Sequence, residues 1–274
     1  MTFNLQPGIS PLLVSMPHIG RDIPPHLQDT YDPRALAVED TDWHLERLYN
    51  FLPDLGASVL QPRFSRYVID LNRPPDDAPM YPGASNTELC PTRFFTGDAL
   101  YQPGREPNAD ERATRRETYW LPYHTALAQE LARIKAQHGY ALLWDAHSIR
   151  SQIPWLFEGR LPDLNIGTAS GASADNTIAN SVVKAVVDFM ASGDANLPKV
   201  THVLNGRFKG GYITRHYGDT ANHIHALQLE KCQSLYMQED APFAYDAAKA
   251  QQLQPLLQSM MENALQAGKI LYGR

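Results

Sequence analysis

The sequence predicts an α/β domain built around a largely parallel sheet. Short apolar runs alternate along the chain with amphipathic segments that are long enough to form helices, which is the pattern of strand–helix–strand units. Polar residues directly follow several of these runs. Because open α/β sheets bind their ligands at the carboxyl ends of the strands, the same pattern predicts a functional site at one edge of the sheet.

Composition narrows the class of protein. The 274 residues are enough for one large domain, spanning 1–274, with a substantial core. The net charge of −6 offers no general attraction for nucleic acid or for an anionic membrane. The first residues show no basic region followed by an apolar stretch, so no signal peptide is expected. There is no apolar run that could cross a bilayer, and two cysteines are too few for a disulfide framework. These features predict a cytoplasmic protein without a nucleic-acid or membrane partner, and they leave its oligomeric state open.

The first half of the chain holds short elements. Strands are expected at 12–16, 57–60 and 67–71. A helix is expected to start at Asp40 or Thr41, which are good N-caps for the apolar residues that follow at helical spacing, and to end at Pro53. Residues 74–108 hold many of the prolines and almost no periodicity. A connection of that length is often a functional rim or lid.

The second half of the chain alternates more regularly. Helices are expected at 108–138, 174–191 and 244–267. Pro122 should bend the first of them, and Gly139 should cap it. Strands are expected at 140–147, 154–157, 164–168, 200–204 and 226–230. The glycine-punctuated segment 205–218 should be a loop or a hairpin.

Two histidines lie at the ends of predicted strands. Parallel strands would bring His18 and His147 to the same edge of the sheet. Two histidines and one carboxylate with a position left open form a catalytic zinc arrangement. Spacing alone leaves the carboxylate open between Asp42, Asp22 and Asp40. Each histidine could instead be a hydrogen-bonded core residue, and Asp42 could be a helix cap.

Two further acids lie on the same predicted strands. Asp145 precedes His147 by two positions and therefore faces the same side, so it is expected to hold the imidazole of a metal ligand in place. Glu230 closes an apolar strand and is the candidate base for the attacking water and the candidate acid for the leaving amine. A strand-end salt bridge is the alternative for Glu230.

Arginines are the candidates for binding substrate carboxylates, because the guanidinium group binds them bidentately. Arg73 directly follows a predicted strand, and Arg215 lies in the glycine-rich segment. Arg63, Arg66 and Arg93 are expected to be solvated.

Six motifs occur in order along residues 10 to 240: Met16-Pro-His18-Ile-Gly-Arg-Asp-Ile-Pro, Glu39-Asp-Thr-Asp42-Trp, Val68-Ile-Asp-Leu-Asn72-Arg73-Pro, Asp145-Ala-His147-Ser148, Arg207-Phe-Lys-Gly-Gly-Tyr-Ile-Thr-Arg215-His216-Tyr-Gly and Leu227-Gln-Leu-Glu230. Together they resemble the N-formylglutamate amidohydrolase family, which is related to zinc carboxypeptidases and to deacylases of N-acyl amino acids. The resemblance implies a three-layer α/β/α sandwich with a mixed sheet. It also implies hydrolysis of N-formyl-L-glutamate to formate and L-glutamate in histidine degradation, with one divalent metal ion per chain, expected to be zinc.

One departure from the carboxypeptidase pattern affects the ligand set. Carboxypeptidases carry their first two zinc ligands as His-x-x-Glu, but the residue three positions after His18 is Arg21. The resemblance favours Asp42 as the carboxylate ligand, since distant relatives keep an Asp at that point. The predicted metal ligands are therefore His18, Asp42 and His147, with Glu230 as the catalytic base and Asn72, Arg73, Arg215 and His216 as substrate-binding residues.

Two alternative functions remain open from the sequence. A zinc carboxypeptidase or a deacylase of another N-acyl amino acid would use the same site, because residues 74–108 could shape a larger acyl pocket. A metal-free binding protein for a dicarboxylic amino acid would use the arginines and would keep the histidines in its core.

Overall fold

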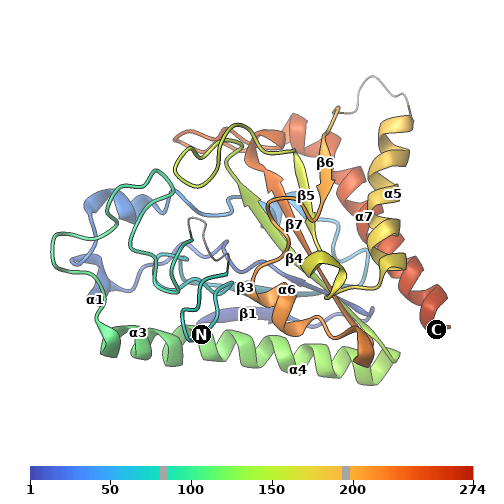
Figure 1. Cartoon of the computed structure of the whole chain (residues 1–274), viewed down its shortest axis with the longest axis horizontal. Helices are drawn as coiled ribbons and strands as arrows, with labels where there is room; N and C mark the ends of the chain where they lie inside the picture. The colour runs from blue at the N-terminus through green and yellow to red at the C-terminus, as the bar shows by residue number, and fades with distance from the viewer. Residues whose placement is uncertain (81–85, 193–197, 274) are drawn as a thin grey trace.

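Seven strands form one mixed sheet in the computed structural model, which describes residues 1–80, 86–192 and 198–273 (Figure 1). The strands are β1 (Phe3–Gln6), β2 (Leu12–Ser15), β3 (Ser58–Pro62), β4 (Ala141–Ile149), β5 (Leu164–Gly167), β6 (His202–Leu204) and β7 (Ile224–Cys232). The helices are α1 (Pro25–Gln28), α2 (Leu45–Leu48), α3 (Ala109–Arg115), α4 (Leu121–His138), α5 (Asn176–Ala191), α6 (Tyr212–Tyr217) and α7 (Ala247–Tyr272).

The strand order is β1-β3-β2-β4-β7-β5-β6. The four central strands β3, β2, β4 and β7 run parallel to one another. β1 is antiparallel to β3, β5 is antiparallel to β7, and β6 is parallel to β5. In the register of β4 and β7, His147 lies opposite Glu230. The carboxyl ends of the two central strands therefore bring the predicted imidazole and the predicted base side by side.

Helices cover both faces of the sheet, with α5 and α7 on one face and α4 on the other (Figure 1). Alternate side chains of β4 pack into two different cores. Leu142 packs with Val182 of α5 and Leu257 of α7, whereas Leu143 packs with Leu127 of α4. The predicted three-layer α/β/α arrangement with a mixed sheet is thus confirmed.

Side-chain caps mark the starts of the long helices. Asp175 accepts a hydrogen bond from the backbone nitrogen of Thr177 at the start of α5, and Asp246 accepts one from the nitrogen of Lys249 at the start of α7. Gly139 ends α4 at a φ of 80°, as predicted. Upstream of Pro122 the backbone forms a π-helical turn, Arg116–Trp120, so the predicted helix 108–138 is interrupted before the proline.

The helix predicted to start at Asp40 or Thr41 is wrong in extent. Only Leu45–Leu48 is helical, and the residues around it form turns. His44, at the start of the helix, has a φ of 63°, which breaks the helical path between Asp42 and α2. The apolar positions still enter the core, since Leu45 and Leu52 are buried. The helical spacing of these apolar residues therefore reflects their burial in the core, although the backbone does not form a continuous helix.

Two predicted strands, 67–71 and 154–157, are turns. The first is held by the ion pair of Arg66 with Asp70, which lies four residues on, and the second by the carbonyl of Ile153, which accepts from two following nitrogens. In the segment predicted as a loop or hairpin, residues 212–217 form α6. The sequence did not predict β1.

Residues 81–85 of the proline-rich segment lie outside the described residues. No helix within the described part of the chain combines the length and apolar character needed to span a bilayer.

Candidate metal centre and active site

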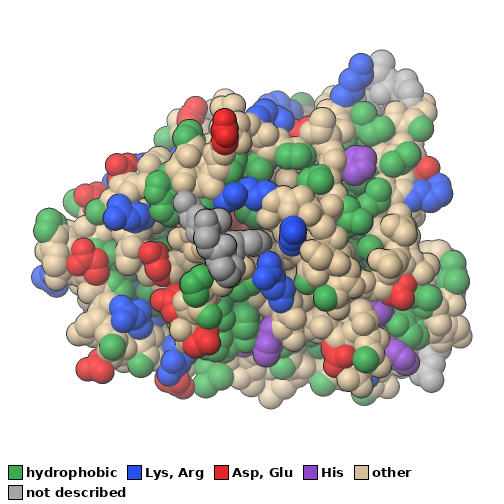
Figure 2. Space-filling view, in the orientation of Figure 1, with side chains coloured by type: hydrophobic (Ala, Val, Ile, Leu, Met, Phe, Trp, Pro, Cys, Tyr) green, Lys and Arg blue, Asp and Glu red, His purple; other side chains and the backbone are tan. Residues whose placement is uncertain are grey.

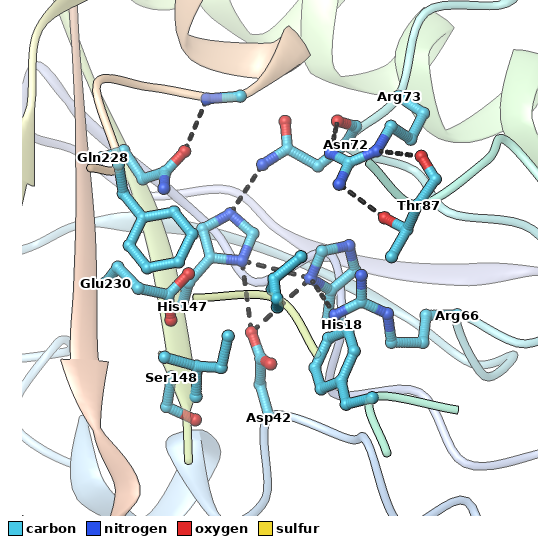
Figure 3. Close-up of a pocket in the computed structure, with 15 residues that line it drawn as sticks. His18, Asp42, Arg66, Asn72, Arg73, Thr87, His147, Ser148, Gln228 and Glu230 are labelled. Atoms are coloured by element: carbon cyan, nitrogen blue, oxygen red, sulfur yellow. Dashed lines mark hydrogen bonds and ion pairs between the residues drawn. The ribbon is translucent and has the colours of Figure 1, made fainter. Parts of the chain in front are cut away.

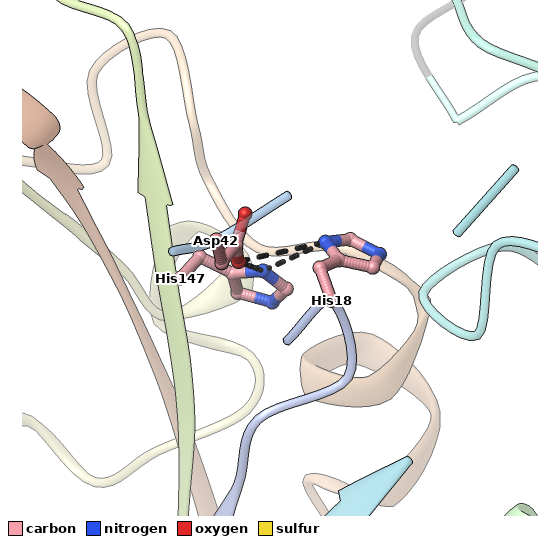
Figure 4. A group of neighbouring side chains, drawn as sticks. All are labelled: His18, Asp42 and His147. Carbon is pink, nitrogen blue, oxygen red and sulfur yellow. Dashed lines mark hydrogen bonds and ion pairs between the residues drawn. The ribbon is translucent and has the colours of Figure 1, made fainter. Parts of the chain in front are cut away.

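Three predicted metal ligands, His18, Asp42 and His147, form one buried cluster (Figure 4). His147 lies on β4, while His18 and Asp42 lie in loops that are joined by a hydrogen bond from the nitrogen of Asp42 to the carbonyl of His18. The Nδ1 atoms of the two rings are 3.2 Å apart. Oδ2 of Asp42 lies 3.2 Å from Nδ1 of His147 and 3.7 Å from Nδ1 of His18.

A second carboxylate orients each imidazole. Nε2 of His18 is 2.7 Å from Oδ1 of Asp70, and Nε2 of His147 is 3.1 Å from Oδ2 of Asp145. Nε2 of His18 faces only a carboxylate among these neighbours, so this ring keeps its proton there and presents the lone pair of Nδ1 to the cluster. Nε2 of His147 lies between Oδ2 of Asp145 and Nδ2 of Asn72, which is 2.9 Å away, and these two side chains hold the ring with Nδ1 toward the cluster. The predicted role of Asp145 therefore has a counterpart, Asp70, on the other ring.

The charges around the cluster favour a cation. Burial and the nearby Arg66 lower the pKa of His18. Burial also disfavours the charged form of His147, but the carboxylates of Asp145 and Asp42 outweigh it and raise its pKa to about 10. Burial raises the pKa of Asp42, yet the hydrogen bond from His147 and the neighbouring positive charges bring it below its ordinary value. The carboxylates of Asp42 and Asp145 therefore favour a positive charge at this position.

The cluster fits a tetrahedral metal. Ligands about 2.0–2.2 Å from zinc lie about 3.3–3.6 Å apart in tetrahedral geometry, and the observed separations are 3.2, 3.2 and 3.7 Å. Two nitrogens and one oxygen form a set that binds catalytic zinc and leaves a fourth position for water or substrate.

The other two candidate carboxylates are engaged elsewhere. Asp22 forms an exposed ion pair with Arg63, and Asp40 accepts from the hydroxyl of Tyr67 and the nitrogen of Phe95. Asp42 is not a helix cap, because α2 starts after it and has no side-chain cap.

Glu230 lies on β7 beside the cluster and lines the same cavity. Burial raises its pKa to about 8, with the charge of His147 opposing the increase and that of Asp42 adding to it. Oε1 of Glu230 is buried and has no hydrogen-bond partner in the described part of the chain. A salt bridge, the alternative interpretation of this residue, is thus not observed among the described residues. A buried carboxyl with an unused oxygen beside a metal site is typical of a general acid–base.

A small cavity of about 60 Å³ lies against the cluster and Glu230 (Figure 3). One water molecule needs about 10–15 Å³, so the space next to the cluster is large enough for a small group such as a formyl group. Its walls include the aromatic rings of Phe95 and Phe208 and the aliphatic Ile149 and Leu156, which limit the access of water.

Asn72 joins the cavity to its surroundings. Its Nδ2 donates to Asp145, and its Oδ1 accepts from the nitrogen of Ile213. Gly211 packs so closely against it that a Cβ atom at this position would lie 2.4 Å from Nδ2 of Asn72. The side chain predicted to bind substrate thus also positions the carboxylate that orients His147.

The carbonyls of residues 71 to 73 are all hydrogen-bonded, although this segment belongs to no strand or helix. Nε2 of His124 lies 2.9 Å from the carbonyl oxygen of Leu71, and Nε1 of Trp120 donates to that of Arg73 at 3.0 Å. The carbonyl of Asn72 accepts from Nη1 of Arg73. This loop is therefore fixed in place by donors from the π-helical turn, from α4 and from its own side chain.

Two arginines, Arg66 and Arg73, line the cavity, although the sequence led us to expect a solvated side chain for Arg66. Arg73, which is predicted to bind substrate, lies there, with Nε and Nη2 donating to the carbonyl and hydroxyl of Thr87. The expectation that Arg66 is solvated is wrong, because it is 7% exposed and donates to Asp70 at 2.6 Å. Its four-residue spacing from Asp70 is a weak local signal for this pair.

Arg215 and His216 lie on α6 and are not among the residues that line the cavity. Arg215 donates to the carbonyls of Gly210 and Met80, and His216 stacks on Tyr212. Figure 2 shows basic side chains near the centre of one face of the molecule. Such a patch attracts anions locally despite the negative net charge.

The sequence model of the family described as N-formylglutamate amidohydrolase matches residues 10–237. The chain is 50% identical over 265 residues to the N-formylglutamate deformylase of Pseudomonas aeruginosa, covering 97% of this chain and 96% of that protein. The chain belongs to the N-formylglutamate amidohydrolase family. The N-formylglutamate deformylase of Pseudomonas putida is 49% identical over 267 residues, 97% of each chain. The family resemblance inferred from the six motifs is thus confirmed.

Solved structures share the fold of this family member. The crystal structure of an N-formylglutamate amidohydrolase from Ralstonia eutropha has a TM-score of 0.77 and 21% identity, covering 98% of both chains. A gene product of Agrobacterium tumefaciens has a TM-score of 0.70 and 19% identity, covering 97% of this chain and 95% of that one. At these identities the likeness concerns the fold alone.

Proposed function

We propose that this protein is a metal-dependent amidohydrolase that converts N-formyl-L-glutamate to formate and L-glutamate. The observation that carries the substrate assignment is the match, over 97% of the chain, to the curated N-formylglutamate deformylase of Pseudomonas aeruginosa. The cluster of His18, Asp42 and His147 supports a divalent metal, for which zinc suits the donor set.

The metal, when bound, supplies Lewis-acid polarisation of the formyl oxygen and activates water for attack. Glu230 takes the proton of the attacking water and returns it to the leaving nitrogen. Burial gives this carboxyl the high proton affinity that such a relay needs. Arg66, fixed by Asp70 at the wall of the cavity, places a positive charge where negative charge develops on the formyl oxygen.

The glutamate end of the substrate provides most of the binding energy, because a formyl group offers little surface. Arg73 uses three of its N–H groups on Thr87 and Asn72, which holds the guanidinium rigid; within the described residues, its other two N–H groups have no partner and are candidates for binding a carboxylate. Arg215 and His216, outside the cavity lining, are the candidates for contacts with the outer end of the substrate.

A side-by-side assay separates this function from its alternatives. Formate, acetate or succinate release is measured with N-formyl-, N-acetyl- and N-succinyl-L-glutamate, and we expect hydrolysis of the formyl compound alone, in line with the similarity to the N-formylglutamate deformylase of Pseudomonas aeruginosa. Preference for the acetyl or succinyl compound would favour a deacylase of another N-acyl amino acid. Binding of formylglutamate without hydrolysis would favour the metal-free binding protein.

The metal and the base are tested on the same protein. Elemental analysis should find one divalent ion per chain, chelation should abolish activity, and zinc should restore it. Glu230→Gln should keep the metal and lose about 10²- to 10⁴-fold in kcat, whereas Glu262→Gln, at an exposed position on α7, should behave as wild type. A fully active metal-free protein would contradict the metal, and full turnover by the Glu230 variant would contradict the base.

A further inference from the structure

Gln228 lines the cavity, and its amide nitrogen has no acceptor among the residues that the structure describes. It lies on β7 two residues before Glu230, so the two side chains point to the same side of the sheet (Figure 3). The residue is only 4% exposed, and its register partner on β4 is Asp145. Buried amides in proteins normally satisfy their hydrogen-bonding groups, so an unused donor here points to a ligand.

A neighbouring backbone group fixes the orientation of this amide. Oε1 of Gln228 accepts the N–H of Gly211 at 2.6 Å. Because the oxygen is committed to a donor, the NH₂ group must point the other way. Among residues 1–80, 86–192 and 198–273, no acceptor is hydrogen-bonded to Nε2. Both of its N–H groups are therefore available to a molecule in the cavity.

The chemistry of the cavity selects the acceptor. Arg66 and Arg73 line the same cavity as Gln228, so the cavity as a whole favours a bound anion. Residues two apart on a strand are separated by about 6.6–6.8 Å, and Glu230 and Gln228 have side chains of equal length. When the scissile carbon of the substrate lies beside Glu230, the α-carboxylate, which is attached to the Cα next to the scissile bond, lies within this distance of Glu230 and can reach Gln228. The other carboxylate of a glutamate moiety extends farther from the reacting centre.

We propose that Gln228 determines specificity by donating a hydrogen bond from Nε2 to the α-carboxylate of the N-acyl amino acid. This inference rests on the proposed deformylase function and extends it to the recognition of one particular carboxylate. The N–H of Gly211 is the group that turns the amide toward the substrate.

The test compares three substrates in four proteins. The substrates are N-formyl-L-glutamate, its α-amide and its γ-amide. The proteins are wild type, Gln228→Glu, Gln228→Met and Gln266→Glu. Glutamate at 228 keeps an oxygen for Gly211 and removes the donor, methionine removes both, and Gln266→Glu adds the same charge at an exposed position on α7.

We expect the wild-type preference in kcat/KM for formylglutamate over its α-amide to fall about 10- to 100-fold in both Gln228 variants, the loss expected for a hydrogen bond to a charged group. The change should arise mainly in KM, and the preference over the γ-amide should be unchanged. Gln266→Glu should match wild type. Because each preference is a ratio within one protein, differences in folded fraction or metal content cancel.

Three results would overturn the inference. These are an unchanged α-amide preference, a preference that changes only against the γ-amide, and a kcat that falls equally for all three substrates. If wild type hydrolyses formylglutamate and the preference is unchanged, this inference alone fails. If wild type hydrolyses none of the substrates, the proposed function fails and takes this inference with it.

Discussion

Asp145→Asn is expected to weaken metal binding while leaving the fold intact. Oδ2 of Asp145 lies 3.1 Å from Nε2 of His147 and accepts from Asn72 at 3.2 Å, which keeps Nδ1 of the ring turned toward the cluster. Asparagine has the same shape but lacks the charge that supports the ring. Loss of such a carboxylate reduces metal affinity about 10- to 100-fold, which is about 1.4–2.7 kcal/mol. The fold should tolerate the change, because burying a neutral amide costs less than burying a carboxylate.

Zinc affinity is measured by competition with a chelator of known affinity, and thermal unfolding is followed with and without zinc. Asp22→Asn is the matched control, since it removes another loop carboxylate whose side chain is 48% exposed and lies outside the cluster. The control should bind zinc within about twofold of wild type. If Asp145→Asn does so too, the supporting role assigned to Asp145 is refuted. If the variant also unfolds in the absence of metal, its primary role is structural.

Three further predictions follow from contacts in and near the site. Gly211→Ala should lower kcat/KM about 100-fold, since displacement of Asn72 by an ångström misplaces the reacting groups; wild-type kinetics would show that this contact is unimportant. Arg73→Ala should raise KM for formylglutamate at least about tenfold and more than Arg215→Ala does, because Arg73 lines the cavity and Arg215 does not; the reverse order would contradict this ranking. Asp163→Asn should reduce the free energy of unfolding by about 1–3 kcal/mol at pH 7. Burial opposes the charge of Asp163, but its hydrogen bonds and ion pair lower its folded-state pKa below 3.8, so this difference should shrink as the pH falls below about 4; a difference independent of pH would refute the reasoning.

Residues placed by the sheet could be predicted from the sequence. His147 and Glu230 each end an apolar run, and parallel strands necessarily carry such ends to one edge. His18 follows the same logic from β2. Asp42 could not be chosen by spacing, because a loop and not a helix brings it to the two rings; the family resemblance supplied that choice.

Residues placed by contacts between distant segments could not be predicted. Asp70 orients His18 across 52 positions, and Arg66 is buried through that same carboxylate. Gln228 was not singled out from the sequence, because the direction of its side-chain amide is set by a hydrogen bond from Gly211, which precedes α6. The strand-like composition of 67–71 was misleading for the same reason. Its residues are apolar because they are buried, while its backbone turns to satisfy the ion pair.

The hydrogen bonds to the backbone carbonyls of residues 71 to 73 reduce the entropy that is lost when substrate binds. A flexible loop would lose conformational freedom at every encounter, and that loss would be subtracted from each binding event. Here His124 and Trp120 immobilise the peptide when the chain folds. The entropy is lost once per molecule instead of once per turnover, so a ligand as small as a formylated amino acid keeps more of the attraction from its few charged groups.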